Sequence, residues 1–141
     1  MYTFSQETRE ALLKFRLGTS RAKTPQAKIY SIDIKTQEIK AAEEEIYTDM
    51  QELADALPET SPRFVLLSYP MTMSRYVQPS GGFSVPYVLL YYRPENCNPK
   101  QYMSYAGAVE EVREAAGVNR VIELDNAEDL ETIETRLARK E

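Results

Sequence analysis

The sequence predicts an α/β protein built on one mixed sheet of about five strands, with helices on both faces. Two nearly continuous apolar runs, 63–69 and 84–92, are typical of central strands that are covered on both faces. A long helix at 99–116 leads into a short strand at 120–124, which indicates a parallel crossover onto the same sheet.

Length and composition describe an ordinary globular domain. The chain has 141 residues, 43% hydrophobic and 28% charged, and we expect one domain spanning 1–141. A net charge of −5 argues against nucleic acid as the main partner, because phosphate binding favours a basic surface. No apolar run approaches the roughly 18 residues of a membrane span, so no membrane partner is expected. Cys97, the single cysteine, excludes an internal disulfide and fits a reducing cytoplasm; we interpret it as a packing residue.

The first helix is predicted to begin after Ser5, whose hydroxyl suits the N-cap position. Its buried face would hold Leu12 and Phe15 at helical spacing. Gly18 is placed to end it, because glycine adopts the left-handed conformation that follows many helices.

A small basic cluster surrounds the loop after this helix and contains Arg16, Arg21 and Lys23. Two interpretations stay open: a solvated surface, or an electrostatic contact with an acidic partner. Composition and spacing do not distinguish the two.

The middle of the chain begins with a predicted antiparallel hairpin formed by an alternating segment at 27–34 and a short strand at 38–43. Thr48 and Gln51 then form a capping-box pattern that starts a short helix. Pro58 prevents that helix from continuing.

Segment 70–83 joins the two apolar runs and is predicted to form a hairpin loop. It contains two consecutive glycines but lacks the Gly-Lys-Ser/Thr ending and the following helix of a phosphate-binding loop. Near the C-terminus, Asp125 or Asn126 is predicted to cap a last helix. That helix would bury Leu130, Ile133 and Leu137.

The long helix at 99–116 has clear local signals at both ends. Asn98 is the predicted N-cap, Pro99 fits the first helical position, and Gly117 is the predicted left-handed terminator. The spacing predicts a buried face formed by Tyr102, Tyr105, Ala106, Val109, Val112 and Ala116.

The opposite, outer face of this helix is predicted to carry Lys100, Ser104, Gly107, Glu111 and Glu114, with Met103 at its flank. A glycine in the middle of an exposed helical face costs about 1 kcal/mol relative to alanine. We therefore expect a closely approaching partner on this face.

The residues offer little for catalysis. The chain has no histidine, so the commonest general base and zinc ligand is missing, and one cysteine cannot build a thiolate metal site. The carboxylates fall mainly at predicted helix starts and exposed faces, where capping and solvation account for them. The sequence therefore predicts no enzyme, no cofactor and no metal site.

Several motifs together resemble the glia maturation factors, a family of the actin-depolymerising factor homology (cofilin-like) superfamily. They run across essentially the whole chain and comprise Leu57-Pro58-Glu59, Pro62-Arg63-Phe64, Ser68-Tyr69, Cys97-Asn98-Pro99, Met103-Ser104-Tyr105-Ala106-Gly107, Val121-Ile122-Glu123 and Glu128-Asp129-Leu130.

The resemblance implies a monomeric actin-cytoskeleton regulator that binds the actin-related protein 2/3 complex, promotes debranching and inhibits branch nucleation. In the family, the long helix and the N-terminal segment enter the barbed-end groove of an actin-related subunit. The residues implied here are Tyr2, Thr3, Phe4, Ser5, Lys100, Met103, Ser104, Gly107 and Glu111. Apart from the resemblance, Arg16, Arg21, Lys23 and Arg75 are the candidates for a second contact.

A cofilin-like protein that binds and severs filaments is the main alternative. Cofilins carry several basic residues along the long helix, whereas this helix has Lys100 and Arg113 against Glu110, Glu111 and Glu114. Because actin is acidic, an acidic helix disfavours it as a partner, so weak or no binding to actin is expected.

A small-molecule enzyme is a more remote alternative, and it would require a pocket lined by convergent carboxylates and tyrosines. The 70–83 loop, which holds Arg75, is longer than the short acidic turn usual in the family. The role of that turn therefore cannot be carried over to this chain.

Overall fold

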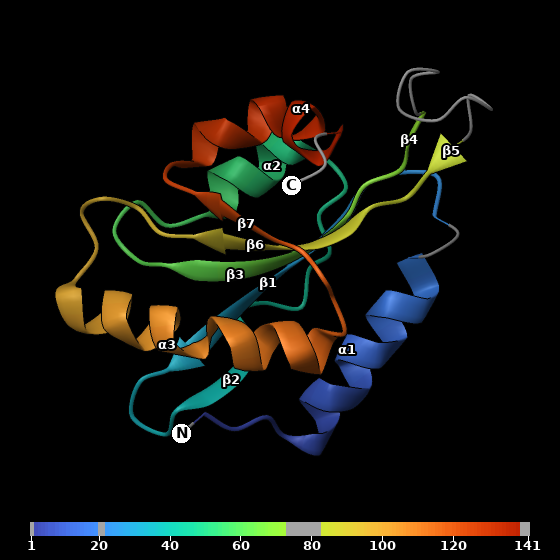
Figure 1. Cartoon of the computed structure of the whole chain (residues 1–141). Helices are drawn as coiled ribbons and strands as arrows, with labels where there is room; N and C mark the ends of the chain where they lie inside the picture. Colours follow the sequence, from blue (N-terminus) through green and yellow to red (C-terminus); the bar gives the residue numbers. More distant parts are fainter. Residues whose placement is uncertain (1, 20–21, 73–82, 139–141) are drawn as a thin grey trace.

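In the computed structural model, residues 2–19, 22–72 and 83–138 are described. They form a five-stranded sheet between two helical layers (Figure 1). The strand order is β2-β1-β3-β6-β7, and every neighbouring pair is antiparallel except β6 and β7. The strands are β1 (Gln26–Asp33), β2 (Glu38–Ala41), β3 (Arg63–Ser68), β6 (Tyr87–Tyr92) and β7 (Val121–Leu124).

The helices divide between the two faces of this sheet (Figure 1). One face is covered by α1 (Gln6–Thr19) and α3 (Pro99–Ala116), and the other by α2 (Met50–Ala56), the 3₁₀ helix η1 (Ala127–Thr132) and α4 (Ile133–Ala138). Each face has its own apolar core, so the mixed sheet covered on both faces is confirmed.

The central strands pair as the apolar runs predict. Leu66 faces Leu89 and Val65 faces Leu90 across β3 and β6, and all four side chains are fully buried. The predicted hairpin of β1 and β2 and the parallel crossover through α3 to β7 are also confirmed.

The predicted strand at 84–92 is interrupted. A short pair, β4 (Met71–Thr72) and β5 (Phe83–Ser84), forms a separate two-stranded sheet, and β6 starts only at Tyr87. Pro86 lacks an N–H group and so cannot donate to a sheet ladder at the position between them. The tip of the predicted loop, including Arg75, lies outside the described residues, as does Arg21.

Several predicted helix ends are shifted. The short helix is capped by Asp49 and not by Thr48, because the Asp49 carboxylate accepts the Gln51 N–H at 2.8 Å. Gly18 does not end the first helix, which continues to Thr19. Near the C-terminus, Asn126 occupies the N-cap position of a 3₁₀ helix that precedes α4, without a capping hydrogen bond from its side chain.

The ends of α3 agree with their local signals. Asn98 Oδ1 accepts the Lys100 N–H at 2.8 Å, and Pro99 is the first helical residue. Gly117 adopts φ 70°, where the Val118 N–H reaches the Arg113 carbonyl at 3.2 Å. Both ends of α3 are therefore fixed by caps. The helix packs into the same apolar core as α1.

Candidate partner-binding surface

The solvent face of α3 is centred on Met103, whose side chain is 74% exposed. Gly107, Glu110 and Glu114 follow it along the same side, and all three are exposed. A methionine this exposed is costly to leave in water and suits an apolar contact with a partner.

The helix is rotated relative to the prediction. Tyr102 and Ala106, predicted to be buried, are exposed, whereas Ala108 is fully buried. Ser104 and Glu111, predicted on the open face, are half-buried. The face turned to the sheet consists of Tyr105, Ala108, Val112 and Ala116. The apolar spacing was ambiguous because alanine and tyrosine occur on both sides of the helix.

Two long-range contacts fix α3 in place, and the first comes from Tyr105. Its hydroxyl accepts the Ile32 N–H at 3.0 Å, and its ring packs 5.2 Å from that of Phe64. The β1–β3 pairing ends at Tyr30 and Phe64, so no β3 residue is paired with Ile32. Tyr105 supplies the acceptor in place of a strand.

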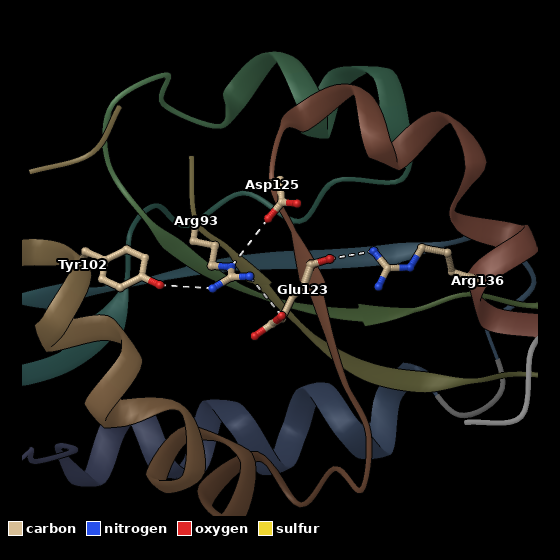
Figure 2. A network of polar contacts seen from close by, with 5 residues as sticks. All are labelled: Arg93, Tyr102, Glu123, Asp125 and Arg136. Carbon is tan, nitrogen blue, oxygen red and sulfur yellow. Dashed lines mark hydrogen bonds and ion pairs between the residues drawn. The ribbon is translucent and has the colours of Figure 1, made fainter. Parts of the chain in front are cut away.

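The second contact is a polar network at the start of α3 (Figure 2). Arg93 follows β6 and donates to the Tyr102 hydroxyl at 3.1 Å and to the Glu123 carboxylate at 3.2 Å. Its Nε lies 3.6 Å from Asp125. Arg136 of α4 donates to the Glu123 carbonyl at 2.6 Å. The network joins α3, β7 and α4 through two guanidinium groups, those of Arg93 and Arg136, which meet at Glu123.

The environment of Arg93 explains why Tyr102 stays at the surface. Partial burial lowers the pKa of Arg93, but Glu123, Tyr102 and Asp125 together raise it further, and the net shift is upward. The guanidinium is therefore held charged, and its hydrogen bond holds the Tyr102 hydroxyl at the exposed end of β6. No short-range sequence pattern signals this role, since the two residues are nine positions apart.

A hollow of about 420 Å³ lies beside Met103, and sequence reasoning missed it. Three separate segments form it, so no contiguous motif could have indicated it. It is lined by Arg93, Pro94, Glu95, Cys97, Pro99, Tyr102, Met103 and Asp125. Its size and largely apolar walls fit a side chain from a partner.

The N-terminal segment lies against both the sheet edge and α3. The Thr3 N–H donates to the Gln37 carbonyl at 3.0 Å, and the Ile39 N–H donates to the Thr3 carbonyl at 2.8 Å. The Tyr2 hydroxyl lies 3.5 Å from the position that a Cβ on Gly107 would occupy. The structure thus brings Tyr2 and the long helix together, as the predicted site requires.

This arrangement gives Gly107 an internal neighbour that the sequence did not reveal. The 3.5 Å separation is an ordinary van der Waals contact, so an alanine fits, whereas a larger side chain would displace Tyr2. Phe4 and Ser5 serve the fold: Arg9 lies 5.1 Å over the Phe4 ring, and Ser5 Oγ accepts the Thr8 N–H at 3.1 Å.

The second half of α3 presents the acidic side chains of Glu110 and Glu114 to solvent. Arg113 is held by Glu110 at 2.6 Å and lies 4.0 Å from Glu114. The hydrogen bond to Glu110 and that residue's charge raise the pKa of Arg113. Lys100 stands alone as the exposed cation at the helix start, so the two halves of the surface differ in charge.

The predicted second contact lies elsewhere. Arg16 packs across the C-terminal end of α3, with its Nη1 2.5 Å from the position of a Cβ on Gly117. Lys23 is exposed. Arg16 is therefore at the opposite end of α3 from Lys100, and it is not part of the surface around Met103.

A hollow of about 970 Å³ lies between α2 and η1 and bears on the enzyme alternative. Tyr69 and Tyr92 line it together with several carboxylates. Both hydroxyls are already engaged, because Tyr69 donates to Glu134 and Tyr92 to the Pro58 carbonyl, each at 2.7 Å. Burial and Glu134 raise the pKa of Tyr69 to about 12. These tyrosines serve the packing of the helices and not acid–base chemistry.

Two negative findings concern the described part of the chain. Residues 2–19, 22–72 and 83–138 contain no group of three or more His, Cys, Asp or Glu side chains placed to hold a metal ion. Among the helices of these same ranges, none has the length and apolar character needed to cross a membrane.

The fold is that of a cofilin-type domain. Residues 1–138 match the family described as cofilin/tropomyosin-type actin-binding protein, and the chain belongs to this family. The family consists of actin regulators that are not enzymes, so the prediction of no catalytic activity is confirmed.

Within the family, the relatives found include glia maturation factors. The chain is 37% identical to protein AIM7 of Saccharomyces cerevisiae, covering 97% of this chain and 96% of that protein. It is 34% identical to glia maturation factor beta of Mus musculus, covering 86% of this chain and 80% of that protein. The solution structure of glia maturation factor from Caenorhabditis elegans superposes with a TM-score of 0.77 at 28% identity, covering 96% and 95%.

A cofilin from Streptomyces griseoflavus superposes with the same TM-score of 0.77 at 19% identity, covering all of both chains, which shows the common fold. The resemblance seen in the motifs is confirmed. The protein is an actin-cytoskeleton regulator similar to the glia maturation factors.

Proposed function

We propose that this protein binds the actin-related protein 2/3 complex, promotes the dissociation of actin branches and inhibits the nucleation of new ones. The observation that carries the proposal is Met103, 74% exposed on a helix that is anchored at both ends. An apolar side chain on a rigid helix beside a hollow has the form of a binding hot spot. The similarity to glia maturation factors supports this choice of partner.

The anchoring of α3 matters for affinity. Tyr105 ties its middle to β1, the Arg93–Tyr102 contact ties its start, and the Gly117 cap fixes its end. A surface ordered before binding loses less conformational entropy when the partner docks. We propose that Met103, Lys100 and Tyr2 enter the barbed-end groove of an actin-related subunit, with Ser104 and Gly107 at its border.

Charge selects the partner in this proposal. Glu110 and Glu114 face solvent on the second half of α3, where they would repel the acidic surface of ordinary actin filaments. Binding to actin itself is therefore weak or absent. Severing of filaments remains the alternative activity, and it requires an attraction that these side chains do not provide.

Debranching follows from differential affinity. A factor that binds a complex released from the daughter filament more tightly than one at an intact junction shifts the equilibrium toward release. The same binding occupies the surface that a new daughter filament would need, which inhibits nucleation. We place the protein, as a monomer with one domain over 1–141, in branched actin networks of the cytoplasm.

The proposal is tested by Met103→Glu, with Ile46→Glu as a matched control. Both substitutions place a carboxylate on an exposed apolar residue, since Ile46 is 43% exposed and lies outside the proposed surface. Met103→Glu should weaken binding to the purified actin-related protein 2/3 complex by about tenfold or more, as expected when a hot-spot contact is lost. Ile46→Glu should bind like the unchanged protein.

Equal binding by a folded Met103→Glu variant would remove α3 from the proposed interface. Co-sedimentation with actin filaments at physiological salt separates the main alternative. Strong co-sedimentation that Met103→Glu abolishes would favour a cofilin-like filament binder.

A further inference from the structure

A groove of about 510 Å³ lies where the end of α1, the start of β6 and the turn between α3 and β7 meet. Leu17, Val85, Pro86 and Val118 give it an apolar lining. Leu17 is 66% exposed, a position in which a leucine contributes little to the core. An open apolar groove edged by an exposed leucine has the form of a docking site for a chain segment.

The hydroxyl groups in this groove are already used within the fold. Ser68 donates to the Thr19 carbonyl at 3.4 Å, and Tyr87 donates to the Ala116 carbonyl at 3.3 Å. Burial also raises the pKa of Tyr87, so its hydroxyl stays neutral. The groove therefore offers a bound chain segment apolar surface and not free hydroxyl groups.

The charge of the groove is positive in a chain whose net charge is −5. Arg16 and Arg120 line it, and no Asp or Glu is among its described lining residues. The Arg120 Nη atoms donate to the carbonyls of Leu137 and Arg136 at 3.1 and 2.5 Å. Within the described ranges, the ion pairs involve only Arg93 and Arg113, so both groove cations lack a carboxylate partner.

From this arrangement we infer that the groove docks an acidic segment of a protein partner. Bulky apolar side chains of the segment would lie on Leu17, Val85 and Pro86, while its carboxylates would face Arg16. Arg120, whose Nη atoms are held by α4 carbonyls, would add positive charge nearby. The concave shape favours a protein segment over a membrane surface, which a convex apolar ridge would fit better. The two cations complement the carboxylates of such a segment.

This site is separate from the surface around Met103. Gly117 lies 14 positions after Met103, so the two sites are about 21 Å apart along α3 at the usual rise per residue. The inference therefore does not rest on the proposed function. A partner segment in the groove and a partner subunit at Met103 could be held by one molecule at the same time.

The test uses the isotopically labelled full chain and a short peptide in which leucines and glutamates recur at helical spacing. When the peptide is added, the backbone amide signals of the protein should shift at Leu17, Val85 and Val118 and not around Met103. The same peptide with glutamine in place of glutamate should bind about tenfold more weakly, because the charge complementarity is lost.

Two groove variants and one matched control sharpen this test. Arg16→Gln and Leu17→Ser should each lower the affinity for the peptide about fivefold or more. If Arg16→Gln disturbs folding, Leu17→Ser still tests the groove. Lys14→Gln removes one cation from the exposed side of the same helix without touching the groove and should leave affinity unchanged.

Three results would overturn the inference: no shifts at millimolar peptide, shifts centred on another part of the protein, or equal binding of the glutamine peptide. Binding of phosphatidylserine vesicles that Leu17→Ser abolishes, without peptide binding, would assign the groove to a membrane surface and equally overturn it.

Discussion

Replacing Tyr105 by phenylalanine removes one hydroxyl from the centre of the molecule. The Tyr105 side chain is 2% exposed, and its oxygen accepts the Ile32 N–H at 3.0 Å. The phenylalanine ring would keep the packing against Phe64, so the change isolates the hydrogen bond. The Ile32 N–H would then be buried without an acceptor, because the β1–β3 pairing ends at Tyr30.

A buried donor left without a partner costs about 1–3 kcal/mol. We expect the free energy of unfolding to fall by about 2 kcal/mol, which corresponds to a melting temperature lower by about 8 °C for a domain of this size. Urea denaturation measures the first quantity and circular dichroism the second. The slope of the urea transition should not change, because the surface exposed on unfolding stays the same.

Tyr102→Phe is the matched control for this measurement. It also removes a tyrosine hydroxyl from α3, but Tyr102 is 39% exposed and its partner is the solvated Arg93 guanidinium at 3.1 Å. Its cost should stay below about 1 kcal/mol. If both variants lost the same stability, the Tyr105 hydroxyl would not be the acceptor that replaces a missing strand.

Three further outcomes follow from the structure. Gly117→Ala should lower the free energy of unfolding by at least about 1 kcal/mol, because Gly117 has φ 70° and the Arg16 guanidinium lies 2.5 Å from the new Cβ; unchanged urea denaturation would contradict this. Gly107→Ala should stabilise the protein by up to about 1 kcal/mol and retain binding, since the added Cβ meets Tyr2 at an ordinary 3.5 Å. Gly107→Leu should displace Tyr2 and weaken binding to the actin-related protein 2/3 complex. Full-strength binding by Gly107→Leu would refute the role of the Tyr2 contact. Stability should fall as pH rises from about 10 to about 12, because burial raises the pKa of Tyr30 and Tyr91 to about 12 and the unfolded chain releases those protons first; melting temperatures that stay constant to pH 12 would contradict the burial of both hydroxyls.

The features of the fold that were predictable from the sequence are those encoded by local chemistry. Asn98, Pro99 and Gly117 define the ends of α3 because each acts on backbone groups within a few residues. The strands at the centre were recognisable since a strand covered on both faces is apolar at nearly every position, as between Phe64 and Leu67.

The features that escaped prediction depend on contacts between distant segments. Tyr102 fits an apolar stripe, yet it is exposed because Arg93 holds its hydroxyl. Gly107 appeared to await a partner, whereas Tyr2 already lies against it. Neither the hollow beside Met103 nor the groove beside Leu17 follows from spacing, since each is formed by segments that only the fold brings together.

The most direct test of the proposed function is the lifetime of individual actin branches, measured by fluorescence microscopy with the protein present. The unchanged protein and Ile46→Glu should shorten branch lifetimes relative to buffer, without fragmenting unbranched filaments. Met103→Glu, folded and at the same concentration, should leave lifetimes close to those in buffer. Branches that dissociate equally fast with Met103→Glu, or filaments severed away from junctions, would contradict the account.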